Sequence, residues 1–181
     1  PQINASLCID CQLCNQVCPT RNKKNGSKPI ATYAVKNKDS VTHLASSSGG
    51  IFTSLAQYVL QQGGVIYGAA YDNQGEVRHI SVETNENLAR LRGSKYVQSQ
   101  IGNCYLEVKK QLKEGRQVLF SGTPCQVAGL RNFLRKDYCN LLTVDLVCNS
   151  VPSPRIWRDY LKYINRNSPA ERRIVTNKKT I

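Results

Sequence analysis

Four cysteines close to the amino end constrain this chain more than any other feature. Cys8, Cys11, Cys14 and Cys18 follow the spacing C-x2-C-x2-C-x3-C, and Pro19 comes directly after the last of them. Bacterial-type ferredoxins use this spacing to bind a [4Fe-4S] cluster, because thiolates so placed on a tight loop can converge on the corners of one cube. We therefore expect residues 1–20 to form a partial ferredoxin-like motif, with these four cysteines as metal ligands.

The same run raises a question about the extent of the chain. In ferredoxins with two clusters, the fourth cysteine of one run ligates the other cluster. One such run is present, so Cys18 lacks a second cluster and the first three cysteines lack a fourth ligand. The chain also begins with Pro1 rather than methionine. These features predict a fragment whose upstream cysteine run is missing.

The length and the cysteine usage indicate one domain plus a small module in a reduced compartment. The chain has 181 residues, against a typical domain of about 150 residues. No apolar run approaches the roughly 18 residues that span a bilayer, and no signal-peptide pattern opens the chain. The other four cysteines are isolated in the sequence, which favours a cytoplasmic protein over a secreted disulfide scaffold.

The chain is strongly basic, with 25 Lys and Arg against 12 Asp and Glu and a formal net charge of +13. Solvated surface explains most of these side chains, but a basic face also attracts acidic proteins and phosphate-bearing cofactors. We expect an acidic redox partner, such as ferredoxin or another subunit, and a small-molecule electron donor or acceptor. Nucleic acid is not expected, because no reader motif is present.

Apolar periodicity divides the rest of the chain into predicted elements. Residues 21–45 are polar and basic and are interpreted as a linker. A helical pattern then runs from Ile51 to Leu60 and ends at Gly63-Gly64. Val65–Tyr71 is predicted to be a buried strand, and Val77–Val82 to be its partner across a turn.

Two helices and a crossover unit are predicted next. The helices cover Glu86–Leu91 and Ile101–Glu114, the second ending at Gly115. A strand at Val118–Phe120, a helix at Gln126–Leu134 and a strand at Leu141–Val147 then form a βαβ pattern, which places two strands in parallel.

The last predicted elements complete the fold class. Ser153 and Pro154 begin a helix that continues to Ile164, and Arg172–Ile181 resembles the start of a strand. The predicted fold class is α/β, with a mixed or mostly parallel sheet flanked by helices behind the partial cluster loop. Residues 46–181 form the α/β domain, which we expect to be truncated at its carboxyl end.

Two loops of small residues precede predicted helices. Ser121–Gln126 joins a strand to a helix, and Ser46–Gly50 opens another helix. Ligands of open α/β sheets bind at the carboxyl ends of strands, and the free N–H groups of a helix start favour anions. Either loop could hold a phosphate or the edge of a flavin. Ordinary helix capping explains the same residues equally well.

Few other side chains indicate a catalytic or metal-binding role. Cys125 lies where a helix dipole lowers a thiol pKa, so it is open as a cluster ligand, a redox thiol or a packed residue, and Cys148 has the same options. The single cysteines at 104 and 139 are expected to be structural, and both histidines to be surface or core residues. No catalytic residue is assigned, which suits chemistry carried by a cofactor.

Four stretches in one order then point to a family. They are SSGGIFT at 47–53, RGSKYVQS at 92–99, FSGTPCQVAGL at 120–130, and DLVC at 145–148 followed by VPS at 151–153. Together they resemble the coenzyme F420 hydrogenase/dehydrogenase beta-subunit family, and the similarity covers nearly all of residues 8–165. The chain looks like a bacterial homologue.

The resemblance implies an FAD-binding α/β domain, here residues 46–181, fused to ferredoxin-like cluster motifs. Members move a hydride at the flavin and single electrons through iron–sulfur clusters. The resemblance also places Lys95 near a phosphate or the flavin ring. Carried over by motif, the flavin-binding residues would be Ser47, Ser48, Gly49, Gly50, Thr53, Gly93, Ser94, Lys95, Tyr96, Gly122, Thr123, Pro124, Cys125 and Gln126.

One position departs from the family pattern. Where the family has Cys-His-Gly before Val-Pro-Ser, this chain has Cys148-Asn149-Ser150. A proton donor or substrate contact expected from that histidine is therefore replaced by Asn149.

The sequence favours an iron–sulfur flavoprotein oxidoreductase. It would pass electrons between [4Fe-4S] clusters and FAD, with hydride transfer to or from a deazaflavin or another organic acceptor. A non-catalytic electron-relay subunit of a larger redox complex is one alternative, and a zinc or nucleic-acid binding module is another. Zinc sites usually group their ligands as two separated pairs, which the compact cysteine run does not do.

Overall fold

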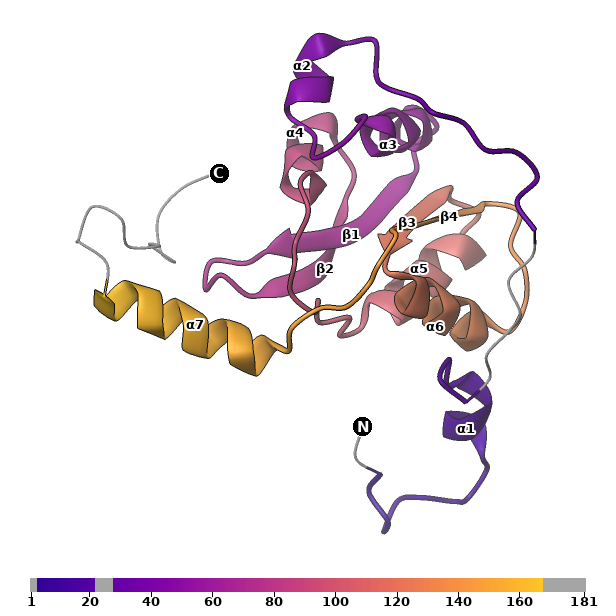
Figure 1. Cartoon of the computed structure of the whole chain (residues 1–181). Coiled ribbons are helices and arrows are strands. Elements are labelled where there is room, and N and C mark those ends of the chain that lie inside the picture. Colours follow the sequence, from indigo (N-terminus) through magenta and orange to yellow (C-terminus); the bar gives the residue numbers. More distant parts are fainter. Residues whose placement is uncertain (1–2, 22–27, 168–181) are drawn as a thin grey trace.

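The computed structural model describes residues 3–21 and 28–167 as a mixed four-stranded sheet flanked by helices (Figure 1). The strand order is β2-β1-β3-β4. The strands are β1 (Val65–Tyr71), β2 (Val77–Val82), β3 (Val118–Gly122) and β4 (Leu141–Asp145). The helices are α1 (Leu13–Val17), α2 (Ser40–Leu44), α3 (Ile51–Gln61), α4 (Asn85–Leu88), η1 (Ala89–Leu91), α5 (Cys104–Lys113), α6 (Pro124–Leu134) and α7 (Pro154–Asn167). The predicted α/β fold class is confirmed.

Strands β1 and β2 form the predicted hairpin, with Ile66 paired to Val82 and Tyr71 to Val77. The Asp72 carboxylate holds the turn, since its Oδ1 accepts hydrogen bonds from the backbone N–H groups of Gln74 and Glu76 at 2.9 Å each. The hairpin forms one antiparallel edge of an otherwise parallel sheet.

The predicted βαβ unit is present as β3, α6 and β4. Strand β3 pairs in parallel with β1 on one side and with β4 on the other. All five residues of β3 are buried, as expected for a central strand without the alternation of an exposed face. Strand β3 is therefore the central strand of the sheet, and β1 and β4 run parallel to it on either side.

Helices cover both faces of the sheet (Figure 1). On one face, α5 and α6 pack on a core of Val65, Tyr67, Cys104, Val108, Leu112, Val118, Phe120, Val127, Leu130 and Leu134. On the other face, α3, α4 and η1 pack on Ala56, Val59, Ile66, Ala70, Val82, Leu88, Leu91 and Leu119. Alternate residues of β1 and β3 point into these two cores, which makes a three-layer α/β/α arrangement.

Three segments lie outside this layered domain. Helix α1 packs against α6, and α2 lies within the predicted linker, where the Asp39 carboxylate caps it. Helix α7 is held to the β1–β2 turn because Trp157 Nε1 donates to the carbonyl of Gly75 at 2.7 Å and Arg158 pairs with Glu76 at 2.8 Å. Within the described residues, no helix combines the length and the apolar character that crossing a bilayer requires.

Some element boundaries differ from the sequence prediction. Helix α5 begins at Cys104 rather than at residue 101, because Gly102 has a φ of 52° and interrupts a helical start. Strand β4 ends at Asp145, and the exposed Leu146 and Val147 that follow it lie outside the sheet. The predicted strand at 172–181 lies outside the described residues.

The packing of the core predicts that two leucine-to-alanine substitutions differ in their effect on stability. Leu119→Ala should lower the free energy of unfolding by about 2–5 kcal/mol, because a fully buried leucine leaves a cavity. Leu106→Ala is the matched control, since Leu106 is 58% exposed, and it should change the free energy by less than about 0.5 kcal/mol. Urea unfolding followed by circular dichroism measures both. Equal losses in the two variants would contradict this packing.

Candidate functional site

The three predicted flavin-binding stretches lie at one edge of the sheet. Strands β1 and β3 are parallel, so their carboxyl ends lie at the same edge. Helix α3 precedes β1 and packs against it, so the helix begins at this edge, and α6 follows β3 and also begins there (Figure 1). We call this the carboxyl edge. It is the place where open α/β sheets bind ligands.

The first stretch is the serine–glycine loop, residues 46–50, with the first turn of α3. Gly50 is the N-cap of α3, with a φ of 76°, and no side chain caps the helix. Glycine adopts this left-handed conformation without the steric cost that other residues have. Within residues 3–21 and 28–167, no side chain caps the first N–H groups of α3, which leaves a helix start suited to an anion.

The second stretch belongs to the crossing segment, residues 92–100, which passes from η1 on one face of the sheet toward α5 on the other (Figure 1). The backbone N–H of Ser94 donates to Ser47 Oγ at 2.9 Å, and Arg92 Nε donates to Thr53 Oγ1 at 3.2 Å. The structure therefore brings the 47–53 and 93–96 stretches together. Ser47, Gly93 and Ser94 are exposed there.

The third stretch is the Gly122 loop, residues 121–126. The Thr123 side chain caps the backbone of Gln126, and Gln126 Oε1 accepts from the N–H of Thr123 at 3.0 Å, so the loop closes on itself as a capping box. The helix-capping interpretation is confirmed for this loop. Its exposed Pro124 and Cys125 still face solvent at the carboxyl edge.

Lys95 is the predicted site residue with the most perturbed surroundings. Its Nζ donates to the carbonyl of Arg92 at 2.6 Å and to that of Arg90 at 3.2 Å, at the carbonyl end of η1. Burial lowers the pKa of the Lys95 amine to about 8. A fraction of the amine is therefore neutral at mildly alkaline pH, beside the exposed Ser94.

Sequence reasoning missed the contact that joins the second and third stretches. His79 on β2 is 9% exposed, and its ring lies within hydrogen-bond distance of Ser99 Oγ and, at 3.0 Å, of the carbonyl oxygen of Ser121. His79 was expected to be a surface or core residue, and the structure shows that it is a core residue. Nothing in its local sequence indicates that its partners are residues of these two loops.

The cluster cysteines lie in a tight, exposed loop around α1. Asp10 and Gln12 both have positive φ values, 49° and 58°, which turn the chain sharply between the first three cysteines. The first three cysteines are exposed, and Cys18 is half-exposed. Backbone N–H groups of Arg21 and Thr20 lower the pKa of the Cys18 thiol, which favours the thiolate that binds metal.

The four thiols do not converge in the described residues, where no three Cys, His, Asp or Glu side chains are grouped as metal ligands. The donor set nevertheless fits an iron–sulfur cluster, since the four thiols lie within residues 8–18 and the described residues form no disulfide. A site of this kind assembles when the metal binds.

The other four cysteines differ in how far they are buried. Cys104 is buried, and burial raises the pKa of its thiol to about 12, which agrees with a structural role. Cys139 was expected to be structural too but is exposed. Cys125 and Cys148 are also exposed, and Cys125 Sγ lies 3.1 Å from Thr123 Oγ1.

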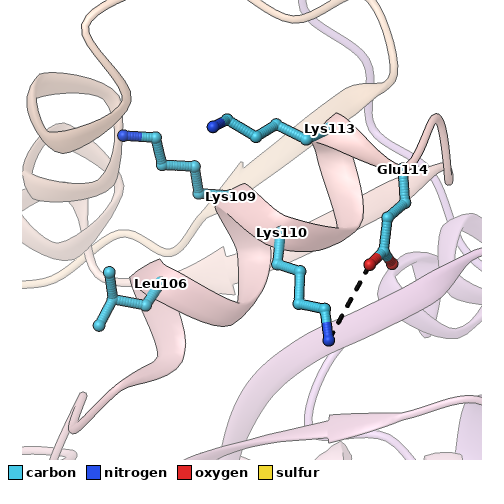
Figure 2. Close-up of a pocket in the computed structure, with 5 residues that line it drawn as sticks. All are labelled: Leu106, Lys109, Lys110, Lys113 and Glu114. Atoms are coloured by element: carbon cyan, nitrogen blue, oxygen red, sulfur yellow. Dashed lines mark ion pairs between the residues drawn. The ribbon is translucent and has the colours of Figure 1, made fainter.

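Two surface depressions lie away from the carboxyl edge. The larger, about 410 Å³, is on the outer side of α5 and is lined by Leu106, Lys109, Lys110, Lys113 and Glu114. Figure 2 shows its lysines extending from the helix, with Lys110 paired to Glu114 at 3.9 Å. The smaller lies between α6 and β4 and is lined by Arg131, Leu134, Lys136, Asp137, Tyr138, Leu141 and Thr143. Neither contains a predicted flavin residue.

Comparisons with known proteins decide the family. The models of the coenzyme F420 hydrogenase/dehydrogenase beta subunit match at residues 32–104 for its N-terminal part and 115–172 for its C-terminal part. The chain belongs to this family. A 4Fe-4S binding domain model matches residues 1–22, which contain all four predicted cluster cysteines of this family member.

A solved structure shares the fold of this beta-subunit family member. It is the F420-reducing [NiFe] hydrogenase complex from Methanosarcina barkeri, in which one chain aligns with a TM-score of 0.58 and 22% sequence identity. The alignment covers 74% of the present chain and 49% of the other, so this chain spans about half of that protein's length. A search of curated proteins found no match.

The surroundings of Lys95 give a test of pH dependence. Its folded pKa of about 8 lies below the ordinary value of 10.5, so the unfolded chain binds more protons between these two pH values. Stability from this residue therefore rises with pH across that interval. The acylation rate of Lys95, followed by mass spectrometry, should level off above pH 8 in the folded protein.

The same residue in urea-unfolded protein is the control, and its acylation rate should keep rising toward pH 10.5. A rate that also rises to that pH in the folded protein would contradict the lowered pKa.

Proposed function

We propose that this protein is an iron–sulfur flavoprotein oxidoreductase. It would pass electrons between a [4Fe-4S] cluster at Cys8, Cys11, Cys14 and Cys18 and FAD at the carboxyl edge. The observation that supports this most strongly is that one chain combines the 4Fe-4S binding domain match with the beta-subunit family domain. When bound, FAD would exchange hydride with an organic acceptor or a deazaflavin and single electrons with the cluster.

The residues at the carboxyl edge fit a phosphate-bearing cofactor. Helix α3 begins there without a side-chain cap, and Ser47 in the loop before it is exposed and bonded to the exposed Ser94. Because the capping box of α6 already satisfies that helix start, α3 is the better candidate for the anionic part of FAD. Lys95 would then supply positive charge to the same part of the cofactor.

Helix α6 connects the two proposed cofactor sites. Its first residues belong to the Gly122 loop, and near its other end Asn132 Nδ2 lies 3.4 Å from the carbonyl oxygen of Val17 in α1. Its 11 residues are about 16 Å long at 1.5 Å per residue. The cluster loop and the carboxyl edge are therefore attached to one short, rigid element.

A non-catalytic electron-relay subunit is the second candidate. It is favoured by Asn149, which stands where the family pattern has histidine, and by the fold similarity to a chain of a multi-subunit hydrogenase complex. Turnover of the reconstituted protein with a reduced dye and candidate acceptors separates the two functions. We propose an acidic redox protein or another subunit as the partner, in the cytoplasm.

The cluster proposal predicts a brown protein after anaerobic reconstitution with iron and sulfide. Cys14→Ser should weaken iron binding by at least about tenfold, since even the loss of an outer-shell partner of a metal site costs this much. Cys139→Ser is the matched control, because Cys139 is also exposed but lies outside the motif. Iron and acid-labile sulfide are measured in each. A colourless protein that binds zinc instead would contradict the proposal.

The flavin proposal predicts that the contact between Ser47 and Ser94 supports FAD binding. Ser47→Ala removes the acceptor for the Ser94 N–H, and the dissociation constant for FAD should rise about fivefold to tenfold. Quenching of flavin fluorescence measures the constant. Ser81→Ala on β2, also an exposed serine, should leave it unchanged. Equal affinities of the Ser47 variant and the unaltered protein would count against this placement.

A further inference from the structure

His79 makes a buried connection between two loops that are distant in sequence. Its backbone N–H donates to the carbonyl of Gln100 at 3.0 Å, and its ring lies beside Ser99 Oγ, so β2 holds the end of the crossing segment. On its other side the ring reaches the carbonyl oxygen of Ser121 at 3.0 Å, at the start of the Gly122 loop. One side chain therefore contacts both segments at the carboxyl edge.

The position of the ring follows from the way the sheet opens. Strands β1 and β3 pair from Val65 with Val118 to Tyr67 with Phe120, and the pairing ends there. His79, which faces Ala69 across the β1–β2 ladder, reaches past this end to the next residue of β3. Its ring is stacked on Phe120, with centroids 5.2 Å apart and planes 17° apart. The ring therefore contacts β3 just beyond the point where the pairing of β3 with β1 ends.

The hydrogen-bond partners determine which ring nitrogen carries the proton. A backbone carbonyl only accepts, so Nε2 must donate to Ser121. In a neutral ring Nδ1 is then an acceptor, and the Ser99 hydroxyl donates to it. Burial lowers the pKa of His79, which agrees with a neutral ring near pH 7. All three groups have a partner in this arrangement.

We infer that His79 is a positioning residue for the flavin, holding the crossing segment and the Gly122 loop at a fixed spacing through a neutral Nε2–H imidazole. This inference rests on the proposed function, because the two loops it joins carry predicted flavin-binding residues. A flavin that binds between the two loops needs them at this spacing. If the spacing is already set in the free protein, binding does not incur the entropy cost of ordering the loops.

The test compares FAD affinity with stability in matched variants. H79F keeps an aromatic ring on Phe120 but removes both ring hydrogen bonds, and should raise the dissociation constant for FAD about tenfold or more. Ser99→Ala removes one hydrogen bond without adding volume and should raise it about threefold to tenfold. His79→Gln, whose amide can still donate to the Ser121 carbonyl, should recover part of the affinity.

Asn140→Ala is the control for general destabilisation. Asn140 Nδ2 also bridges two backbone carbonyls, those of Leu112 and Arg116, but near the start of β4 at the opposite end of the sheet. This variant should lose stability in urea and keep the FAD affinity of the unaltered protein. An independent readout is the ring ¹⁵N shifts of His79, which should show a protonated Nε2 and an unprotonated Nδ1.

The outcomes separate the inference from the proposed function. If the unaltered protein does not bind FAD, the proposed function fails and the inference fails with it. If it binds FAD but H79F and Ser99→Ala bind equally well, the inference alone is wrong. A loss of affinity in Asn140→Ala as large as in H79F, or a His79 protonated on Nδ1, also overturns it. Should H79F not fold, Ser99→Ala and the ¹⁵N shifts decide.

Discussion

The parallel pairing of β1 with β3 is the constraint on which the rest of this structure depends. It directs the carboxyl ends of both strands to one edge and leaves the starts of α3 and α6 at that edge. Because the pairing ends at Tyr67 and Phe120, the strands separate just before the Gly122 loop. The crossing segment then passes this opening and is tied to the serine–glycine loop by Ser94.

The helix starts at this edge are chemically different although both are rich in small residues. The α6 start closes on itself through Thr123 and Gln126, whereas the α3 start has only Gly50 as its cap. Similar composition therefore produces one self-satisfied turn and one open turn. The open turn is the one whose preceding loop is tied to the crossing segment, through the hydrogen bond from the Ser94 N–H to Ser47 Oγ.

Local sequence patterns predicted most of the fold and little of the site's assembly. The hairpin, the βαβ unit and the cysteine run follow from short-range periodicity and spacing, which are properties of consecutive residues. The contact of Ser94 with Ser47 and that of His79 with Ser121 join residues 47 and 42 positions apart. A serine or histidine in a strand or loop carries no signal for such a partner, because the tertiary arrangement of distant segments decides it. The boundary at Cys104 was missed because Gly102 adopts a positive φ that composition alone does not reveal.

Hydrogen exchange with and without FAD shows which backbone segments the cofactor covers, and so whether FAD binds at the carboxyl edge. We predict that FAD slows exchange in residues 47–53, 93–99 and 121–126 together, while exchange of the N–H groups in the lysine-lined depression on α5 is unchanged. Slowed exchange at Lys109, Lys110 and Lys113 instead, or none at the carboxyl edge while FAD is bound, would contradict it.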